Sequence, residues 1–366
     1  MQPIAIQIVE LITGVLLLFG GGELFVQGSV ALALLLRVPQ LVIGLTVVSL
    51  GTSAPELFVS AGSFLRGSDA LAISNVVGSN IFNIMVVLGS SALILPLHVE
   101  SRLVRRDVPI LLVISSTVWA ISTSGKIPWT TGLALLITLI INTIWEIRTA
   151  NKEPQKTQEA EPKIKTDKDS KSLIDTVSRL IIGIMLLAIG SKLLVSGATS
   201  IAEFLKIKEE IIGLTIVSAG TSMPELITSL VAAIRGRTDL AIGNVVGSCL
   251  LNQLLVLGTC SLISGAAGIA VDQLLIQQDL PVMVLATLSC MPIFWTKGII
   301  SRGEGGTLVG LYMIYLADKI IPLTFPPLHH SFRLIVSIIM VIGVLIISMK
   351  SYRYWLKTKN LPTIKQ

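Results

Sequence analysis

The sequence predicts an all-α polytopic membrane protein, built from two inverted five-helix repeats with one extra helix near the C-terminus. The first observation is composition: 52% of the residues are hydrophobic and only 14% are charged, whereas about a quarter of a soluble domain is charged. The second is a series of apolar runs, long enough to cross a bilayer core about 30 Å thick. The third is an internal repeat that relates the two halves of the chain.

The apolar runs define eleven expected spans. The first begins at Ile4 and lacks both a basic leading segment and a small-residue cleavage site, so we expect a retained helix instead of a signal peptide. The eleventh has no partner in the repeat. The expected spans are 4–35, 40–65, 71–96, 107–123, 128–147, 177–203, 209–234, 240–265, 279–296, 304–321 and 333–350.

The internal repeat has a constant offset over most of its length. Residues 44–79 match residues 213–248 at an offset of 169, and the same offset aligns 14–28 with 183–197. The repeat unit therefore covers five spans. Because five is odd, the second copy enters the membrane from the opposite side, and such inverted repeats place substrate sites near the membrane midplane.

The repeat also divides the chain. We expect four parts: a first repeat (1–147), a charged cytoplasmic linker (148–176), a second repeat (177–321), and an additional helix with a basic tail (322–366). Basic residues favour an outside N-terminus with the linker and the C-terminus in the cytoplasm. The same bias explains the net charge of +6, so we expect no nucleic-acid partner.

The motif GTSxPE occurs at 51–56 and again at 220–225. In a helix, Thr52, Ser53 and Glu56 would share one face, because they are three and four positions apart. Each proline also releases the carbonyl four residues before it, which needs another partner in a bilayer. A carboxylate in mid-membrane costs about 2.5–3.5 kcal/mol on insertion scales and is by default a functional-site hypothesis.

These groups are suited to binding a cation. Carboxylates, hydroxyls and carbonyls are the hard oxygen ligands of Ca²⁺, and a single Ca²⁺ would neutralise two carboxylates that repel each other. Several Na⁺ or H⁺ would be needed to displace it. The alternative for one copy is a helix kink whose hydroxyls bind loose carbonyls, but two copies with a glutamate in each favour the cation site.

A second motif adds amides. It is SNVVGSNIFN at 74–83 and GNVVGSCLLN at 243–252. Ser79 and Asn83 are four positions apart, as are Ser248 and Asn252, so in helices each pair shares a face. These side chains can add neutral oxygens opposite the glutamates.

Together the motifs resemble the alpha-repeats of the sodium/calcium exchanger family, within the cation/Ca²⁺ antiporter superfamily. The resemblance implies ten core helices, with the second and third of each half enclosing the ions. It also implies exchange of three Na⁺ for one Ca²⁺ by alternating access, through sliding of the first helix of each half. The implied ion ligands, with two serines of the same polar stripe, are Glu56, Glu225, Thr52, Ser53, Thr221, Ser222, Ser79, Ser248, Asn83, Asn252, Ser49 and Ser218.

The resemblance also narrows the subfamily. Proton/calcium exchangers have GNxxE where this chain has GTSxPE, which favours Na⁺ as the counter-ion. Potassium-dependent relatives have an aspartate at the position of Asn252, so we expect no K⁺ cotransport. The short linker suggests a compact prokaryotic exchanger of the plasma (inner) membrane. The chain departs from the family at Cys249, Leu250, Leu251 and Gln253.

Two other transport functions stay open: an H⁺-coupled antiporter, in which a glutamate binds the proton, and a cation channel. An enzyme is not expected, because no nucleophile–base pair stands out in the sequence. The three cysteines lie in expected spans, without metal-ligand spacing. We therefore expect Ca²⁺ and Na⁺ as substrates, the bilayer as surroundings, and no cofactor or protein partner.

Overall fold

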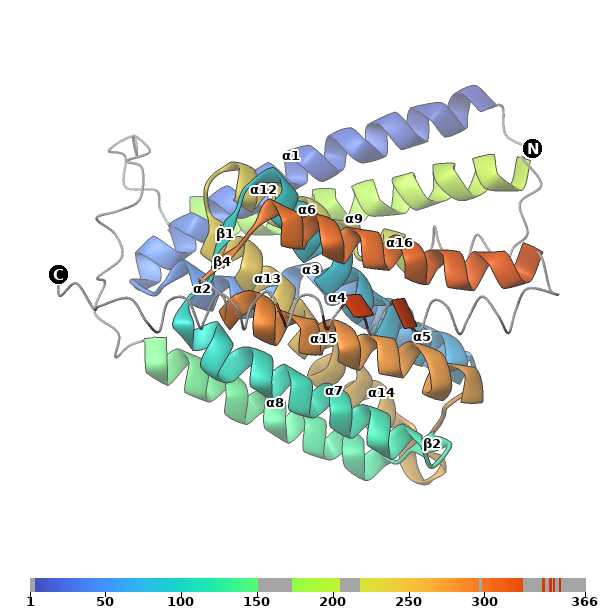
Figure 1. Ribbon diagram of the computed structural model, residues 1–366. Coiled ribbons are helices and arrows are strands. Elements are labelled where there is room, and N and C mark those ends of the chain that lie inside the picture. The colour runs from blue at the N-terminus through green and yellow to red at the C-terminus, as the bar shows by residue number, and fades with distance from the viewer. Residues whose placement is uncertain are drawn as a thin grey trace.

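The computed structural model describes residues 4–150, 173–204, 218–295 and 298–324, with a few isolated positions between 338 and 349. The described chain is a bundle of helices that run roughly side by side (Figure 1). The predicted all-α membrane fold is confirmed. By length and hydropathy, six of the described helices could cross a membrane, or seven if the bent pair Gln40–Thr52 and Ala54–Leu65 is one span.

The first repeat follows the expected order of spans. Its elements are α1 (Ile4–Leu36), α2 (Gln40–Ile43), η1 (Gly44–Val48), α3 (Ser49–Thr52), α4 (Ala54–Leu65), α5 (Asp69–Phe82), η2 (Asn83–Leu88), α6 (Gly89–Ile94), β1 (Leu97–His98), η3 (Leu103–Asp107), α7 (Val108–Ser122), β2 (Lys126–Ile127) and α8 (Trp129–Ala150). Segments η1, η2 and η3 are π-helical turns.

The second repeat has the same order. Its described elements are α9 (Leu173–Phe204), α11 (Ser218–Thr221), α12 (Met223–Ile234), α13 (Thr238–Leu251), η5 (Asn252–Leu257), α14 (Gly258–Ile263), η6 (Gly265–Ala267), β3 (Ile269–Ala270), η7 (Leu275–Asp279), α15 (Leu280–Trp295), β4 (Ile299–Ile300) and α16 (Arg302–Thr324). Helix α8 ends at Ala150 and α9 begins at Leu173, so each helix includes a few residues of the expected linker 148–176. The expected eleventh span at 333–350 lies almost entirely outside the described residues.

Strand pairing demonstrates the inversion. Strand β1, after the third helix of the first repeat, pairs antiparallel with β4, after the fourth helix of the second repeat. Strand β2, after the fourth helix of the first repeat, pairs with β3, after the third helix of the second. Loops of different rank can share one end of the bundle only if the second repeat is inverted.

The repeats interlock through exchanged outer helices. Helix α8 of the first repeat packs on α14 of the second, and α16 packs on α6. A glycine lies at each crossing: an added Cβ on Gly132 would come 2.6 Å from the Gly258 carbonyl oxygen, and one on Gly89 would come 2.9 Å from that of Gly305. The fifth helix of each repeat therefore covers the third helix of the other repeat.

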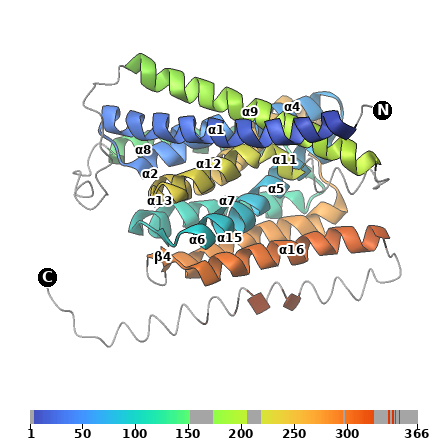
Figure 2. The same cartoon turned by 90° about the horizontal axis from the view of Figure 1, so that it is seen from above.

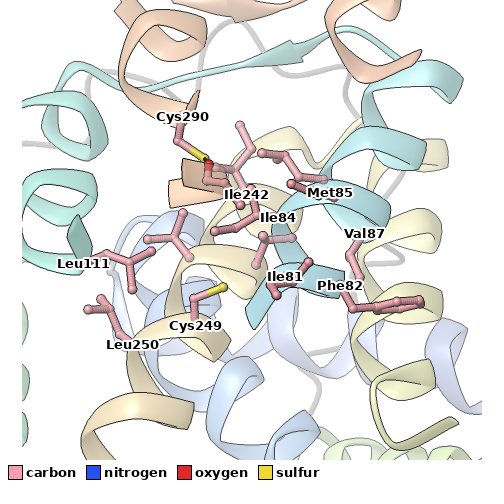
Figure 3. Packing of buried hydrophobic residues seen from close by; sticks show 14 of the residues in the cluster. Ile81, Phe82, Ile84, Met85, Val87, Leu111, Ile242, Cys249, Leu250 and Cys290 are labelled. Carbon is pink, nitrogen blue, oxygen red and sulfur yellow. Dashed lines mark hydrogen bonds between the residues drawn. The ribbon is translucent and has the colours of Figure 1, made fainter. Parts of the chain in front are cut away.

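The motif helices form the centre of the bundle. The helix Thr238–Ile263 is 94% buried over its apolar stretch and Asp69–Ile94 is 78% buried, against 28% for the first helix. Outer side chains are apolar as well, and Leu16, Ile141 and Val113 are more than half exposed. Apolar surfaces on an outer helix suit contact with lipid instead of water. Figure 3 shows part of the packed interior, where Ile81, Ile84 and Cys249 lie close together.

The outer helices of each half are joined by polar clusters. In the first repeat, Glu146 of α8 forms ion pairs with Arg102 and Arg106, and the Arg106 guanidinium lies 3.5 Å from the centre of the Trp145 ring. In the second repeat, Asp279 pairs with Lys319 of α16 at 2.5 Å and accepts a hydrogen bond from Tyr315. Both clusters tie the fourth helix of a repeat to the fifth.

Helices α1 and α9 pack along each other on one flank of the bundle, and both views show them side by side (Figures 1 and 2). Glycines recur every seven residues along both, at 14, 21 and 28 and at 183, 190 and 197. An added Cβ on Gly14 would come 2.9 Å from the Gly190 carbonyl oxygen. Such glycines let two backbones approach closely and strengthen van der Waals packing within a membrane.

This close contact gives a direct test. A Cβ on Gly21 would come 2.8 Å from that of Leu186, whereas a Cβ on Gly20 would meet no atom within 4 Å. We expect Gly21→Ala to destabilise the protein by about 1–3 kcal/mol through overpacking, and Gly20→Ala to change stability by less than about 0.5 kcal/mol. The midpoint of thermal unfolding in detergent measures the stability of both variants. Equal midpoints would contradict close packing of α1 against α9 at Gly21.

Candidate cation-binding site

Both glutamate motifs break their helix. Helix α3 ends at Thr52, Ser53 has φ −85° and ψ 3°, and α4 begins at Ala54, with a bend of 43° between the segments. Ser222 has nearly the same backbone conformation, with φ −91° and ψ 10°. The condition for one shared helical face, an unbroken helix from Thr52 to Glu56, is therefore not met. The proline instead occupies the first turn of a new helix, where its missing N–H costs nothing.

The break places each glutamate in the first turn of a helix. Unsatisfied N–H groups and the helix dipole favour a negative charge at that position. Glu56 and Glu225 are both fully buried, so a cation at their carboxylates would be shielded from water. The two helix starts belong to opposite repeats, which the inversion brings together at the centre of the bundle.

The serines of the motifs connect the two repeats. Ser53 Oγ donates to Glu225 Oε1 at 3.0 Å, and Ser222 Oγ lies 3.1 Å from Glu56 Oε1. Each glutamate is thus bound by the serine of the other repeat, as a twofold relation requires. The second motif helices join the same cluster, because Ser79 Oγ is 3.1 Å from Ser222 Oγ and Ser248 Oγ is 3.4 Å from Thr52 Oγ1.

Several buried polar atoms of the candidate ligands have no hydrogen-bond partner among the described residues. They are Oε2 of Glu56, Oε2 of Glu225, and both amide atoms of Asn83 and Asn252. The Glu56 carboxyl also interacts electrostatically with Glu225. Among the described residues, no basic side chain forms an ion pair with either glutamate. Buried charge without a partner is strongly unfavourable, so these carboxylates require a cation or protons.

Asn83 and Asn252 each begin a π-helical turn, η2 and η5 respectively. One extra residue in a helical turn re-aims the following side chains, and such turns are frequent at functional sites. The sequence placed both asparagines near the glutamates, but nothing in it signalled the change of helix type.

Ser49 has a different position from the other candidates. Its Oγ donates to the Gly44 carbonyl at 2.5 Å and lies 3.2 Å from that of Asn244. An added Cβ on Gly247 would come 2.1 Å from this Oγ. The contacts of Ser49 therefore join two helices and include neither glutamate. The side chain of its counterpart, Ser218, lies outside the described part of the chain.

The carbonyls released by the prolines also differ between the repeats. The Gly220 carbonyl accepts a hydrogen bond from Ser191 of α9 at 2.5 Å, so a hydroxyl supplies the partner that a cation was expected to supply. The counterpart of Ser191 in α1 is Gly22, which has no hydroxyl to donate to Gly51. The two halves of the site are thus related but not identical.

Two asparagines were missed as site residues. Asn75 and Asn244 stand four positions before Ser79 and Ser248 and are buried. Thr52 Oγ1 lies 3.1 Å from Asn244 Oδ1, and Thr221 Oγ1 lies 3.3 Å from Asn75 Oδ1. The spacing of four could have indicated them, because it places them on the same helix face as the serines.

The family departure at Gln253 has a structural explanation. Gln253 Nε2 donates to Asn80 Oδ1 at 3.2 Å and to Ser115 Oγ at 2.9 Å. It therefore joins η5, α5 and α7 through side chains that are not candidate ion ligands. At the repeat-related crossing, Ile84 and Cys249 form an apolar contact region instead (Figure 3).

A cavity of about 250 Å³ lies beside the site. Its wall includes Thr52 and Pro55 of the first motif, Pro224 of the second, and Ile184 and Leu187 of α9. It therefore lies between the two glutamate motifs and α9.

Comparison with known proteins identifies the family. The profile of the family described as "Sodium/calcium exchanger protein" matches residues 6–148 and 176–320. The chain belongs to the sodium/calcium exchanger family. The two matched ranges coincide closely with the two repeats, so membership rests on both halves of the chain.

Individual relatives agree with this. The inner membrane protein YrbG of Escherichia coli is 31% identical over 313 residues, which are 84% of this chain and 94% of YrbG. The sodium/calcium exchanger MaX1 of Methanosarcina acetivorans is 28% identical over 346 residues, 86% of this chain and 98% of MaX1. A solved structure of the sodium–calcium exchanger NCX_Mj is similar with a TM-score of 0.71 and 31% identity, over 85% of this chain and 98% of that one.

Membership confirms the resemblance inferred from the motifs. The chain is an integral membrane protein of the compact prokaryotic exchanger type, and its class is cation/Ca²⁺ antiport.

The Gln253 contacts give a stability test. We expect Gln253→Leu to lower the stability by about 1–3 kcal/mol, because Ser115 and Asn80 lose a buried donor. Adding Ser115→Ala should recover part of the loss, since one orphaned hydroxyl is then removed as well. Unfolding midpoints of the single and double variants measure this, and a double variant that is no more stable than Gln253→Leu would contradict it.

Proposed function

We propose that this protein exchanges Na⁺ for Ca²⁺ across the membrane, three for one and therefore electrogenically, without K⁺. The observation that supports it best is the pair of buried glutamates. Each has one oxygen that accepts a hydrogen bond from the opposite repeat and one oxygen without a partner in the described part of the chain. Such a pair can bind one divalent ion, or several monovalent ions, from both repeats at once.

The ligand set follows from the cluster. Glu56 and Glu225 bind Ca²⁺ directly and are shared with Na⁺. The other ligands are neutral oxygens from both repeats: Thr52, Ser53, Thr221, Ser222, Ser79, Ser248, Asn83 and Asn252. Ser49 is left out of this set, because its contacts are with neighbouring helices.

The composition of the cluster suits a transported ion. Among the described residues, His, Cys, Asp and Glu side chains do not gather in the groups of three typical of a resident metal centre. Ca²⁺ affinity depends on the number of charged ligands and on the rigidity of the site. Two carboxylates with neutral oxygens can bind Ca²⁺ and still release it. The neutral amide of Asn252 also argues against K⁺ cotransport, because the potassium-dependent relatives have an aspartate at this position.

The α1–α9 pair is suited to the moving part. It packs on the flank of the bundle, its own contact is sealed by glycines, and a cavity lies between α9 and the two glutamate motifs. Movement of the pair as one unit would open the site first to one side and then to the other. Such alternation is the expected behaviour of inverted repeats around a midplane site.

Transport in vesicles tests the exchange. In proteoliposomes loaded with Na⁺, Ca²⁺ uptake should occur only with the outward Na⁺ gradient, and replacing all K⁺ by choline should leave it unchanged. An inside-positive potential should accelerate uptake, because each cycle moves one net positive charge outward. The measurement is the initial rate of ⁴⁵Ca²⁺ uptake.

Three results would contradict the proposal in different ways. Equal uptake driven by a proton gradient without Na⁺ would indicate an H⁺-coupled antiporter. Unitary currents in planar bilayers would indicate a channel. Uptake that ignores membrane potential would contradict the stoichiometry while leaving exchange itself intact.

The glutamates give a second test. Glu56→Gln and Glu225→Gln should each abolish Ca²⁺ transport while the protein still inserts, because the neutral amide cannot balance a divalent charge. The matched control is Glu304→Gln at the start of α16, where the carboxylate bonds to Ser301 on the surface, and this variant should transport normally. Normal transport by either site variant would show that the assignment is wrong.

A further inference from the structure

The repeat-related asparagines Asn75 and Asn244 connect the two halves of the site in an unexpected way. Asn244 Oδ1 lies 3.1 Å from Thr52 Oγ1 of the first repeat. Its Nδ2 donates to the Glu225 backbone carbonyl at 3.3 Å and to Ser229 Oγ at 2.9 Å, both in α12 of the second repeat. One fully buried side chain thus joins the threonine of one motif to the glutamate helix of the other.

The same arrangement occurs a second time. Asn75 Oδ1 lies 3.3 Å from Thr221 Oγ1 of the second repeat. Its Nδ2 donates to Ser60 Oγ at 2.9 Å and lies 3.5 Å from the Glu56 backbone carbonyl, both in α4. The sequences around Asn75 and Asn244 are only partly identical, yet both asparagines make the same set of contacts. The arrangement is therefore observed twice within one molecule.

The geometry determines what the asparagines can do. A threonine hydroxyl has one proton and two lone pairs, so a hydroxyl that donates to an amide oxygen still has lone pairs for a cation. Thr52 Oγ1 also lies 3.2 Å from the Val48 carbonyl, but that carbonyl belongs to the same segment. Only a contact to the opposite repeat can fix the distance between the threonine and Glu225.

We propose that Asn75 and Asn244 are positioning residues, each of which fixes the threonine hydroxyl of one repeat against the glutamate helix of the other and so sets the Ca²⁺ affinity. The proposal rests on the Ca²⁺ site proposed above. Neither asparagine needs to touch the ion, since each acts through its threonine.

A buried asparagine that only satisfies the helix backbone would also affect stability. The two roles differ in coupling. If Asn244 acts through Thr52, its removal has little further effect once the hydroxyl is gone. If it only supports the fold, its effect is the same with or without that hydroxyl, because independent changes add.

A double-mutant cycle separates the roles. Ca²⁺ binding is measured by calorimetric titration of the purified full-length protein in Na⁺-free detergent solution. We expect Asn244→Ala and Thr52→Val each to weaken binding about 2- to 12-fold, the range for loss of one hydrogen bond. In the Thr52→Val background, Asn244→Ala should weaken binding by less than about twofold further.

Two controls accompany the cycle. Thr52→Ser keeps the hydroxyl, so in that background Asn244→Ala should keep its full effect. Asn75→Ala acts through Thr221, which is independent of Thr52. The fold-loss of Ca²⁺ binding in Asn75→Ala with Thr52→Val should therefore equal the product of the two single losses. The repeat-related cycle of Thr221→Val with Asn75→Ala should reproduce the first one.

The outcomes are distinct. Full multiplication of the Asn244→Ala and Thr52→Val effects would overturn the proposal. If Asn244→Ala fails to fold, Ser229→Ala replaces it: this variant removes the acceptor of the amide, and should weaken binding only where Thr52 is intact. The titration involves no Na⁺ gradient, so a failure of Na⁺-driven uptake would refute the exchange and leave the positioning role standing.

Discussion

The structure depends on one electrostatic constraint, the burial of two like-charged glutamates at the centre of a membrane protein. Glu56 and Glu225 are fully buried, and none of the described basic side chains forms an ion pair with them. The buried carboxylates are stabilised by helix N-termini and by serine donors from the opposite repeat, and they also require a bound cation or protons. The break in each motif helix, the proline that follows it and the crossed serine contacts all serve this requirement.

The inverted repeat makes that arrangement possible. Each motif supplies one carboxylate and one donating serine, and in the inverted pair each serine donates to the glutamate of the other copy. The strand pairs at both ends of the bundle and the exchanged outer helices hold the copies in this relation. The α1–α9 pair lies outside this framework, on the flank of the central helices.

The symmetry is broken where it does not affect the glutamates. Ser191 binds the carbonyl released in the second motif, whereas the equivalent position in the first repeat is Gly22. Gln253 links three helices by hydrogen bonds, whereas its counterpart Ile84 packs against apolar neighbours. Because of these differences the two repeats are not structurally identical. A transporter that faces different ion concentrations on its two sides does not need identical repeats.

The sequence by itself determined the fold class, the inverted repeat and the cluster around Glu56 and Glu225, because hydropathy, an odd repeat unit and two copied motifs are properties of the residue order. It could not determine that Ser53 and Ser222 bond across the repeats, that Ser49 bonds to the backbone of two helices, or that Asn75 and Asn244 join the motifs. Spacing along one helix fixes only which residues share a face. Contacts between helices depend on the 43° bend, the π-helical turns and the crossing of the two repeats, which only the tertiary structure decided.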